Sequence, residues 1–243
     1  MTRAKQRGFL LNPFRFGGGG GGGDPYFSNV KLLLRMDGEN GSTTIPDSSP
    51  IPKTVSRFGD TKISTAQSKF GGASCVFDGS GDYLTVPAGT DFAFGTGDFT
   101  VEMWFSPSSV TVYHALFYTG QYETNQLSLR VADTGKLQSF IHNGANAYGL
   151  PTGATSLVAG AWHHIAICSA SGVIKVFLNG LQETSATNTR SIASTAAVYI
   201  GAQNVGGKLS LYPTGYIDEL RVTKGVARYT ANFTPPPAPF PNS

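Results

Sequence analysis

The sequence predicts an all-β protein in which two antiparallel sheets pack face to face. Glycine (31 residues) and proline (14) are abundant, while charged residues make up only 14% of the 243-residue chain. That composition is typical of short strands joined by tight turns and excludes a helical bundle or a coiled coil. Apolar and polar side chains also alternate with a period of two. Asx-Gly pairs such as Asp37-Gly38 and Asn179-Gly180 follow several alternating segments, where glycine supplies the positive φ of a turn.

The expected strands follow this alternation in order. The first, residues 30–36, ends at Asp37-Gly38, and the segment 74–77 ends at Asp78-Gly79. Residues 162–168 carry apolar side chains on both faces, which indicates a central strand covered on both sides. The remaining expected strands show simpler alternation and cover residues 83–86, 99–105, 114–119, 127–132, 137–142, 173–178, 197–201 and 216–222. This many short strands at this spacing fill the two sheets of one sandwich domain.

Composition divides the chain into three regions. Residues 1–23 form a basic, phenylalanine-rich arm that ends in the glycine run 17–23, a tether that holds no fixed conformation by itself. Residues 24–230 contain the expected strands and form the sandwich. Residues 231–243 are rich in proline, which favours an extended strap.

Positive charge is concentrated in the arm. The formal net charge is +3, and every basic residue of the arm precedes the first acid, Asp24. The remaining body is close to neutral, so we expect no nucleic-acid partner. No apolar run approaches the roughly 20 residues of a membrane span, and the run 9–11 is too short for a secretion signal. We therefore expect neither membrane insertion nor export.

The cysteines, Cys75 and Cys168, are too few for a disulfide framework and are not spaced as metal ligands. Buried thiols are the favoured interpretation, because free cysteine is among the most buried residue types. A disulfide and a reactive pair are the alternatives.

Several ordered segments resemble one family. They are residues 77–84 (FDGSGDYL), 92–105 (FAFGTGDFTVEMWF), 162–166 (WHHIA), 176–180 (VFLNG), 199–201 (YIG) and 216–222 (YIDELRV). As an ordered set within residues 26–230, they resemble the laminin-G-like, concanavalin A-like jelly-roll superfamily. The resemblance implies a two-sheet antiparallel jelly-roll sandwich, a fold that carries lectins, adhesion modules, glycosidases and structural parts alike.

An enzymatic function is not expected. Glycosidases on this sandwich carry a Glu-x-Asp-x-x-Glu motif that pairs two carboxylates about 5 Å apart, and the motif does not occur in this chain. Asp218 and Glu219 are adjacent, so a regular strand would point them to opposite faces. Neither a His-Glu-x-x-His pattern nor a Gly-x-Ser-x-Gly elbow is present. Of the neighbouring His163 and His164, we expect one in the core and one at the surface.

The resemblance also implies a structural calcium site, although no cofactor is required. Members of the superfamily often hold calcium near strand ends, and Asp78, Asp82 and Asp218 match positions where the family keeps acids. Turn capping by the same aspartates is the alternative interpretation.

Sugar recognition would combine aromatic faces with amide groups, and the loops of the central region contain both. The candidate glycan contacts are Tyr118, Tyr122, Asn125 and Tyr148. Packing or contacts with a partner protein are the alternative roles of such loop aromatics.

The two ends of the chain resemble a narrower group. Residues 7–16 (RGFLLNPFRF) and 233–237 (FTPPP) are similar to segments of bacteriophage virion proteins that carry this jelly roll. The resemblance implies a non-enzymatic virion structural protein, first of all a multi-copy capsid decoration or cement protein, assembled in the host cytoplasm. A tail or fibre adaptor and a free carbohydrate-binding or adhesion module are the alternatives.

The arm is the expected anchor to viral capsid or tail proteins. Burying its apolar side chains would contribute about 1.5–3 kcal/mol each, whereas ordering each of its residues costs about 1–2 kcal/mol of backbone entropy. The arm therefore needs a neighbouring subunit, and a homo-oligomer or lattice would supply the effective concentration. A disordered tail is the alternative. The expected anchoring residues are Phe9, Leu10, Leu11, Phe14, Arg15 and Phe16.

Overall fold

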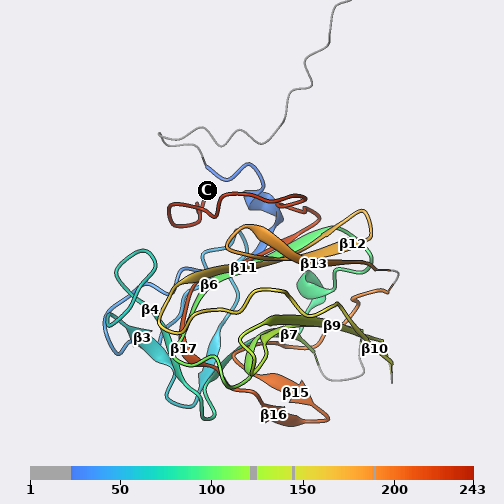
Figure 1. The fold of residues 1–243 in the computed structure, drawn as a ribbon. Helices are drawn as coiled ribbons and strands as arrows, with labels where there is room; N and C mark the ends of the chain where they lie inside the picture. Colours follow the sequence, from blue (N-terminus) through green and yellow to red (C-terminus); the bar gives the residue numbers. More distant parts are fainter. Residues whose placement is uncertain (1–22, 121–124, 144–145, 189) are drawn as a thin grey trace, which may run out of the picture.

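Two large antiparallel sheets pack face to face in the computed structural model, which describes residues 23–120, 125–143, 146–188 and 190–243. Figure 1 shows part of one sheet above the other, with the rest of the upper sheet curving down at the left. The all-β sandwich expected from the sequence is therefore confirmed. In the described residues no helix has the length and apolar character needed to cross a bilayer. The anchoring residues proposed for the arm lie outside the described part of the chain.

The upper layer, sheet A, has the strand order β13-β12-β11-β6-β17-β4-β3, with β1 also paired to β17. Its strands are β1 (Val30–Leu34), β3 (Lys62–Ser64), β4 (Ser74–Asp78), β6 (Phe99–Pro107), β11 (His163–Ala170), β12 (Val173–Leu178), β13 (Leu181–Thr187) and β17 (Thr214–Lys224).

The lower layer, sheet B, has the order β10-β9-β8-β7-β14-β5-β2. Its strands are β2 (Ser56–Phe58), β5 (Tyr83–Val86), β7 (His114–Thr119), β8 (Gln126–Val131), β9 (Leu137–Asn143), β10 (Asn146–Gly149) and β14 (Val198–Ile200). A separate hairpin of β15 (Gln203–Val205) and β16 (Lys208–Ser210) lies below sheet B in Figure 1. Two 3-10 turns, η1 (Phe27–Asn29) and η2 (Thr90–Phe92), complete the described elements.

The core lies between the sheets and follows the alternation along each strand. On β6, Phe99, Val101, Met103 and Phe105 all belong to the main apolar cluster. Phe77 of β4 joins the same cluster and is 1% exposed. Most strands of both sheets contribute one face to this cluster, so its burial supplies most of the driving force for folding.

The outer face of sheet A is covered as well. All of β6 and nearly all of β11 are buried, on both faces, which confirms the expectation of a doubly covered central strand. His163 and His164 are 6% and 0% exposed, so the expectation that one of them reaches the surface is wrong. The His163 Nε2 atom lies within 3.1 Å of the Val158 backbone, and His164 is sealed under the layer that covers sheet A.

The covering layer is built from both ends of the described chain. The proline-rich segment 231–243 runs above sheet A in Figure 1, and Phe240 packs on Val30 and Leu33 of β1. The Asp24 N–H donates to the carbonyl of Ser243 at 2.6 Å. The first and last described residues therefore meet on this face.

Cys75 and Cys168 are both free and buried, which confirms the favoured interpretation and excludes the disulfide. Burial raises the pKa of the Cys168 thiol to about 12, and it raises that of Cys75 well above its usual range. Neither sulfur is a reactive thiolate at neutral pH.

Candidate functional site

An aromatic platform lies on the outer face of sheet B. It consists of Phe58, Tyr83, Tyr199 and Tyr212. The Phe58 and Tyr83 rings stack with centroids 4.5 Å apart and an interplanar angle of 3°, while Tyr199 and Tyr212 lie 6.1 and 6.2 Å from Tyr83. Phe58 is 42% exposed and the three tyrosines are half-buried. The platform therefore presents aromatic surface to solvent instead of filling the core.

The strand register sets this arrangement. Phe58 pairs with Tyr83 across β2 and β5, and Leu84 of β5 pairs with Ile200 of β14. Leu84 and Ile200 both enter the core, so the neighbouring Tyr83 and Tyr199 must face outward. Two-residue periodicity thus lines up rings that are far apart in the sequence.

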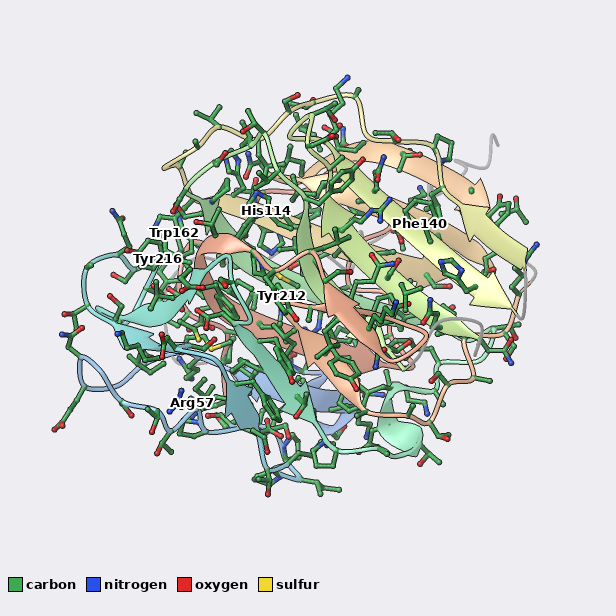
Figure 2. The ribbon with its side chains drawn as sticks, turned by 90° about the horizontal axis from the view of Figure 1, so that it is seen from below. Arg57, His114, Phe140, Trp162, Tyr212 and Tyr216 are labelled. Atoms are coloured by element: carbon green, nitrogen blue, oxygen red, sulfur yellow. The ribbon has the colours of Figure 1, made fainter. Side chains whose placement is uncertain are left out.

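The β15–β16 hairpin holds one side of the platform. The Asn204 side-chain amide donates to the Tyr199 hydroxyl at 3.0 Å, and the Asn204 oxygen accepts from the Gly207 N–H at 3.1 Å. The residues after the hairpin are tied to β7, because the Ala115 N–H donates to the Leu211 carbonyl at 2.7 Å. Tyr212 is labelled at the centre of this face in Figure 2.

A second group on the same face surrounds Arg130, and we call it the arginine cluster. The Arg130 guanidinium lies 4.6 Å from the centroid of the Phe140 ring and 5.1 Å from that of Tyr113. It donates from Nε to Gln138 Oε1 at 3.0 Å and from Nη1 to Gln203 Oε1 at 3.3 Å. All of these side chains are half-buried, and Phe140 is visible on this face in Figure 2. The face thus has an aromatic part and a cationic part, with the hairpin contributing to both.

The expected glycan contacts do not gather at one exposed surface. Tyr118 is 1% exposed, so it offers no ring face to a ligand. Tyr148 packs against the main core and its hydroxyl donates to the Thr187 carbonyl at 3.4 Å. Asn125 is half-buried with a φ of 48°, and Tyr122 lies outside the described residues. The aromatic residues that do form a surface were not singled out from the sequence.

The three aspartates expected at a calcium site are placed in two locations. Asp82 accepts from the backbone N–H groups of Asp60 at 2.6 Å and Asp78 at 2.9 Å. Strands β4 and β17 are neighbours, but Asp78 pairs with Thr214, so Asp218 lies four residues further along β17. Across the described ranges no group of three or more His, Cys, Asp or Glu side chains could hold a metal ion. Calcium binding stays a prediction.

A β-bulge changes the expected geometry of Asp218 and Glu219. The register between β17 and β6 shifts between Asp218 and Arg221, and Glu219 has a φ of 50°. Asp218 accepts from the Lys69 N–H at 2.8 Å, while Glu219 accepts from the Phe240 N–H at 2.8 Å. Both bonds reach segments that cover the outer face of sheet A, so the expectation of opposite faces is wrong. An extra residue in a bulge breaks the simple alternation.

Burial dominates the chemistry of this acidic pair. It raises the pKa of Asp218 to about 6 and that of Glu219 to about 7. Both side chains are almost fully inaccessible, at 0% and 1% exposed. Two carboxyl groups sealed under a covering layer offer no approach to a substrate, so they do not form a glycosidase site.

A buried charge network fixes the covering layer to sheet A. Arg221 donates to Glu102 Oε1 at 2.8 Å and to Asp24 Oδ2 at 3.2 Å, and Arg228 donates to Asp24 at 2.6 Å. Tyr229 donates its hydroxyl hydrogen to Glu102 Oε2 at 2.7 Å. Burial alone would raise the pKa of Glu102, but the Arg221 charge and the hydrogen bond from His164 hold it well below its usual range. The network pairs two arginines with two carboxylates and has a structural role.

Comparison with known proteins agrees with this fold. The family model described as the concanavalin A-like lectin/glucanases superfamily matches residues 78–228. The chain therefore belongs to that superfamily. No curated protein matches the chain.

Solved structures with the same fold include domains of larger proteins. Domain 4 of AbnA, an extracellular GH43 arabinanase from Geobacillus stearothermophilus solved with arabinotriose, aligns with a TM-score of 0.61 at 22% identity over 82% of this chain and 94% of that one. The binding domain of botulinum neurotoxin serotype D gives 0.62 at 12% identity, and that of Paraclostridial Mosquitocidal Protein 1 gives 0.63 at 14%. These two alignments cover 83% and 82% of this chain, and each covers 49% of the toxin chain.

Proposed function

We propose that this chain is a non-enzymatic virion structural protein, a multi-copy capsid decoration that displays a saccharide-binding face. The observation that carries the proposal is the polarity of the sandwich. Asp24 and Ser243 meet on the covered face of sheet A, whereas the aromatic platform and the arginine cluster lie on the outer face of sheet B. One face, the closed face, is thus covered by the two ends of the described chain, and the other, which we call the open face, exposes aromatic and cationic side chains.

The position of Asp24 determines how an anchored sandwich would stand. Its carboxylate is held by Arg221 and Arg228, so the point where the arm joins the domain is fixed on the closed face. An arm bound to capsid or tail proteins through residues 9–16 would be attached at the closed face, and the glycine tether would leave sheet B free to face away from the particle. This orientation suits a display role, with capsid proteins as partners and neighbouring copies in a homo-oligomeric lattice.

The chemistry of the open face favours a saccharide ligand. Stacked rings such as Phe58 and Tyr83 match the apolar faces of sugar rings, and the half-buried tyrosines add hydroxyl groups. The fold is of a carbohydrate-binding type, and one protein of the same fold, domain 4 of AbnA, was solved with arabinotriose. The platform also supports the second candidate, a free carbohydrate-binding or adhesion module.

Mass spectrometry of purified virus particles tests the proposal. A decoration protein would occur at a copy number comparable with that of the major capsid protein, whereas a tail or fibre adaptor would occur in few copies. Absence of the chain from particles, together with saccharide binding by the purified protein, would overturn the virion role and support the free binding module.

A further inference from the structure

Arg130 is a half-buried cation whose partners are neutral. Two aromatic rings flank its guanidinium, and its described hydrogen bonds go to the side-chain oxygens of Gln138 and Gln203. Within the described ranges, no carboxylate lies at ion-pair distance from it. Asp133 in the following turn acts on Arg130 through its charge without forming an ion pair.

Three other arginines of the described residues have carboxylate partners. Arg221 is paired with Glu102 and Asp24, Arg228 with Asp24, and Arg35 with Glu219. Removing a charge from water without an opposite charge is unfavourable. Burial accordingly lowers the pKa of Arg130, although a guanidinium keeps its charge at neutral pH. Arg130 thus holds a positive charge on the open face that no described ion pair compensates.

The surroundings fix the Arg130 side chain in one orientation. Arg130 of β8 and Gln138 of β9 are direct partners in the sheet, and Gln138 also donates from Nε2 to the Thr152 hydroxyl at 3.3 Å. That second bond directs the Gln138 oxygen toward Arg130. Nε and Nη1 of Arg130 donate to the two glutamine oxygens. The third nitrogen, Nη2, has no described acceptor. Nη2 is not among the buried polar atoms that lack a partner, so it keeps contact with solvent.

The described charges that act on His142 at this end of sheet B are positive. His142 lies on β9 two residues beyond Phe140, and its pKa is lowered by burial and then by the charges of Arg130 and Arg190. Its imidazole is therefore neutral at neutral pH and does not repel an anion or attract one by charge. A rigid guanidinium with an open edge is suited to an oxyanion.

We propose that Arg130 binds the anionic group, carboxylate or sulfate, of an acidic saccharide on the outer face of sheet B. This inference rests on the proposed saccharide-binding face and specifies its ligand class. The anionic group accepts hydrogen bonds from the open edge of the guanidinium, and the aromatic platform across the hairpin contacts neutral parts of a longer chain.

Binding of three oligosaccharides to the full-length chain tests the inference by calorimetry. The probes are a sulfated heparin hexasaccharide, a carboxylate-bearing hyaluronan hexasaccharide without sulfate, and neutral maltohexaose. We expect at least one acidic probe to bind more tightly than the neutral one, with a Kd that increases as NaCl is added. Arg130→Gln should weaken acidic binding by about tenfold or more, the loss expected for a charge-assisted pair.

Arg57→Gln is the matched control, because Arg57 is an exposed arginine of the same sheet that donates to the Gly59 carbonyl at 2.6 Å. It should leave the acidic Kd within about twofold, since exposed charges contribute little. The salt titration of the wild-type chain serves as a second readout if Arg130→Gln fails to fold. Equal binding of acidic and neutral probes, or acidic binding unchanged by Arg130→Gln, would overturn the inference while leaving a saccharide-binding face. Failure of all three probes to bind a chain found on particles would overturn the inference and leave the virion role.

Discussion

Phe77 and Trp104 are two buried aromatic residues that lie on different faces of sheet A. Both lie in segments that resemble the superfamily, Phe77 in 77–84 and Trp104 in 92–105. Phe77 packs in the main core and is 1% exposed. Trp104 lies on the outer face of sheet A, edge-on to Phe70 and His164 with the Lys69 ammonium 4.0 Å above its ring. Burial alone does not reveal on which face of a doubly covered sheet a side chain lies.

Phe77→Ala should lower the free energy of unfolding by about 3–5 kcal/mol, because a large ring would leave a cavity between two rigid sheets. The Phe77 ring also lies close to Gly201, so there is little room for collapse around it. Urea denaturation measures the change. Phe77→Leu is the control and should cost less than half as much; a loss below about 1 kcal/mol for alanine would place the ring outside the core.

The acidic pair predicts an unusual pH dependence. The pKa of Glu219 is raised from 4.5 to about 7, so the folded state binds its proton more tightly than the unfolded state does. Its contribution to stability is complete below pH 4.5 and is lost as the pH rises toward 7. Asp218 acts in the same direction between 3.8 and about 6.

Glu219→Gln keeps an acceptor for the Phe240 N–H and removes the titration. We expect the wild-type free energy of unfolding to fall between pH 5 and 7.5 more steeply than that of Glu219→Gln, as followed by urea denaturation in matched buffers. Glu102 has a lowered pKa and therefore titrates below this window. Parallel curves for the two proteins would show that Glu219 is ionised with its usual pKa.

At the scale of elements, the sequence predicts strands best where apolar and polar side chains alternate over four or more residues. Residues 83–86, 114–119 and 173–178 were expected as strands and are β5, β7 and β12. Strands β2, β3, β15 and β16 were not expected. Each has three residues, too few to show alternation unless the neighbouring residues extend the pattern, as they do on either side of β14. The edge strand β13 is mostly polar and mostly exposed, so it lacks the apolar side chains that mark a strand in the sequence.

The strap 231–243 has no regular secondary structure, but it covers part of the outer face of sheet A. Deleting residues 232–243 would remove Phe233 and Phe240 and expose the apolar side chains of Val30 and Leu33. We expect a lower midpoint of thermal unfolding and faster hydrogen exchange at β1 and β17. Ser243 deletion is the control, because it removes only the acceptor of the Asp24 N–H. An unchanged midpoint after the longer deletion would show that the strap is dispensable.

At the scale of the whole molecule, the open face could not have been predicted from the sequence. Its aromatic platform combines residues 58, 83, 199 and 212, and its arginine cluster combines residues 113, 130, 138, 140 and 203. The pairing of β2 with β5 and of β5 with β14 brings residues 58, 83 and 199 together, and the segment after β16, held by β7, adds Tyr212. One signal was available: Tyr83 and Tyr199 each stand next to a core residue in a short strand and so must face outward. The bulge at Glu219 left no such signal, because a bulge has no fixed composition.

Removal of the arm separates folding from assembly. A chain lacking residues 1–22 retains Asp24 and its bonds to Arg221 and Arg228, so we expect an unchanged thermal midpoint and loss of incorporation into particles. The control replaces Phe9, Leu10, Leu11, Phe14 and Phe16 by serine in the full-length chain. Incorporation of the truncated chain at the wild-type level would show that the anchor lies elsewhere.

Calcium is tested on the same whole-molecule scale. If Asp78 and Asp82 bind calcium, a chelator should lower the melting temperature and added calcium should restore it by mass action. Asp82→Asn is the informative variant, since both carboxylate oxygens of Asp82 accept backbone N–H groups. An equal melting temperature with and without calcium would mean that these aspartates only cap the turn.

The contact between Asp24 and Ser243 also gives the sandwich the geometry of a closed loop. A short glycine linker would join these ends without crossing the domain, and new termini could be opened at the Gly206-Gly207 turn of the β15–β16 hairpin, because chain cuts are best tolerated at exposed turns. The same proximity means that residues 24–243 could be grafted whole into a surface turn of another protein. The two residues of the host turn that flank the insertion would need to move apart only slightly. The domain could therefore be inserted into another protein as a unit.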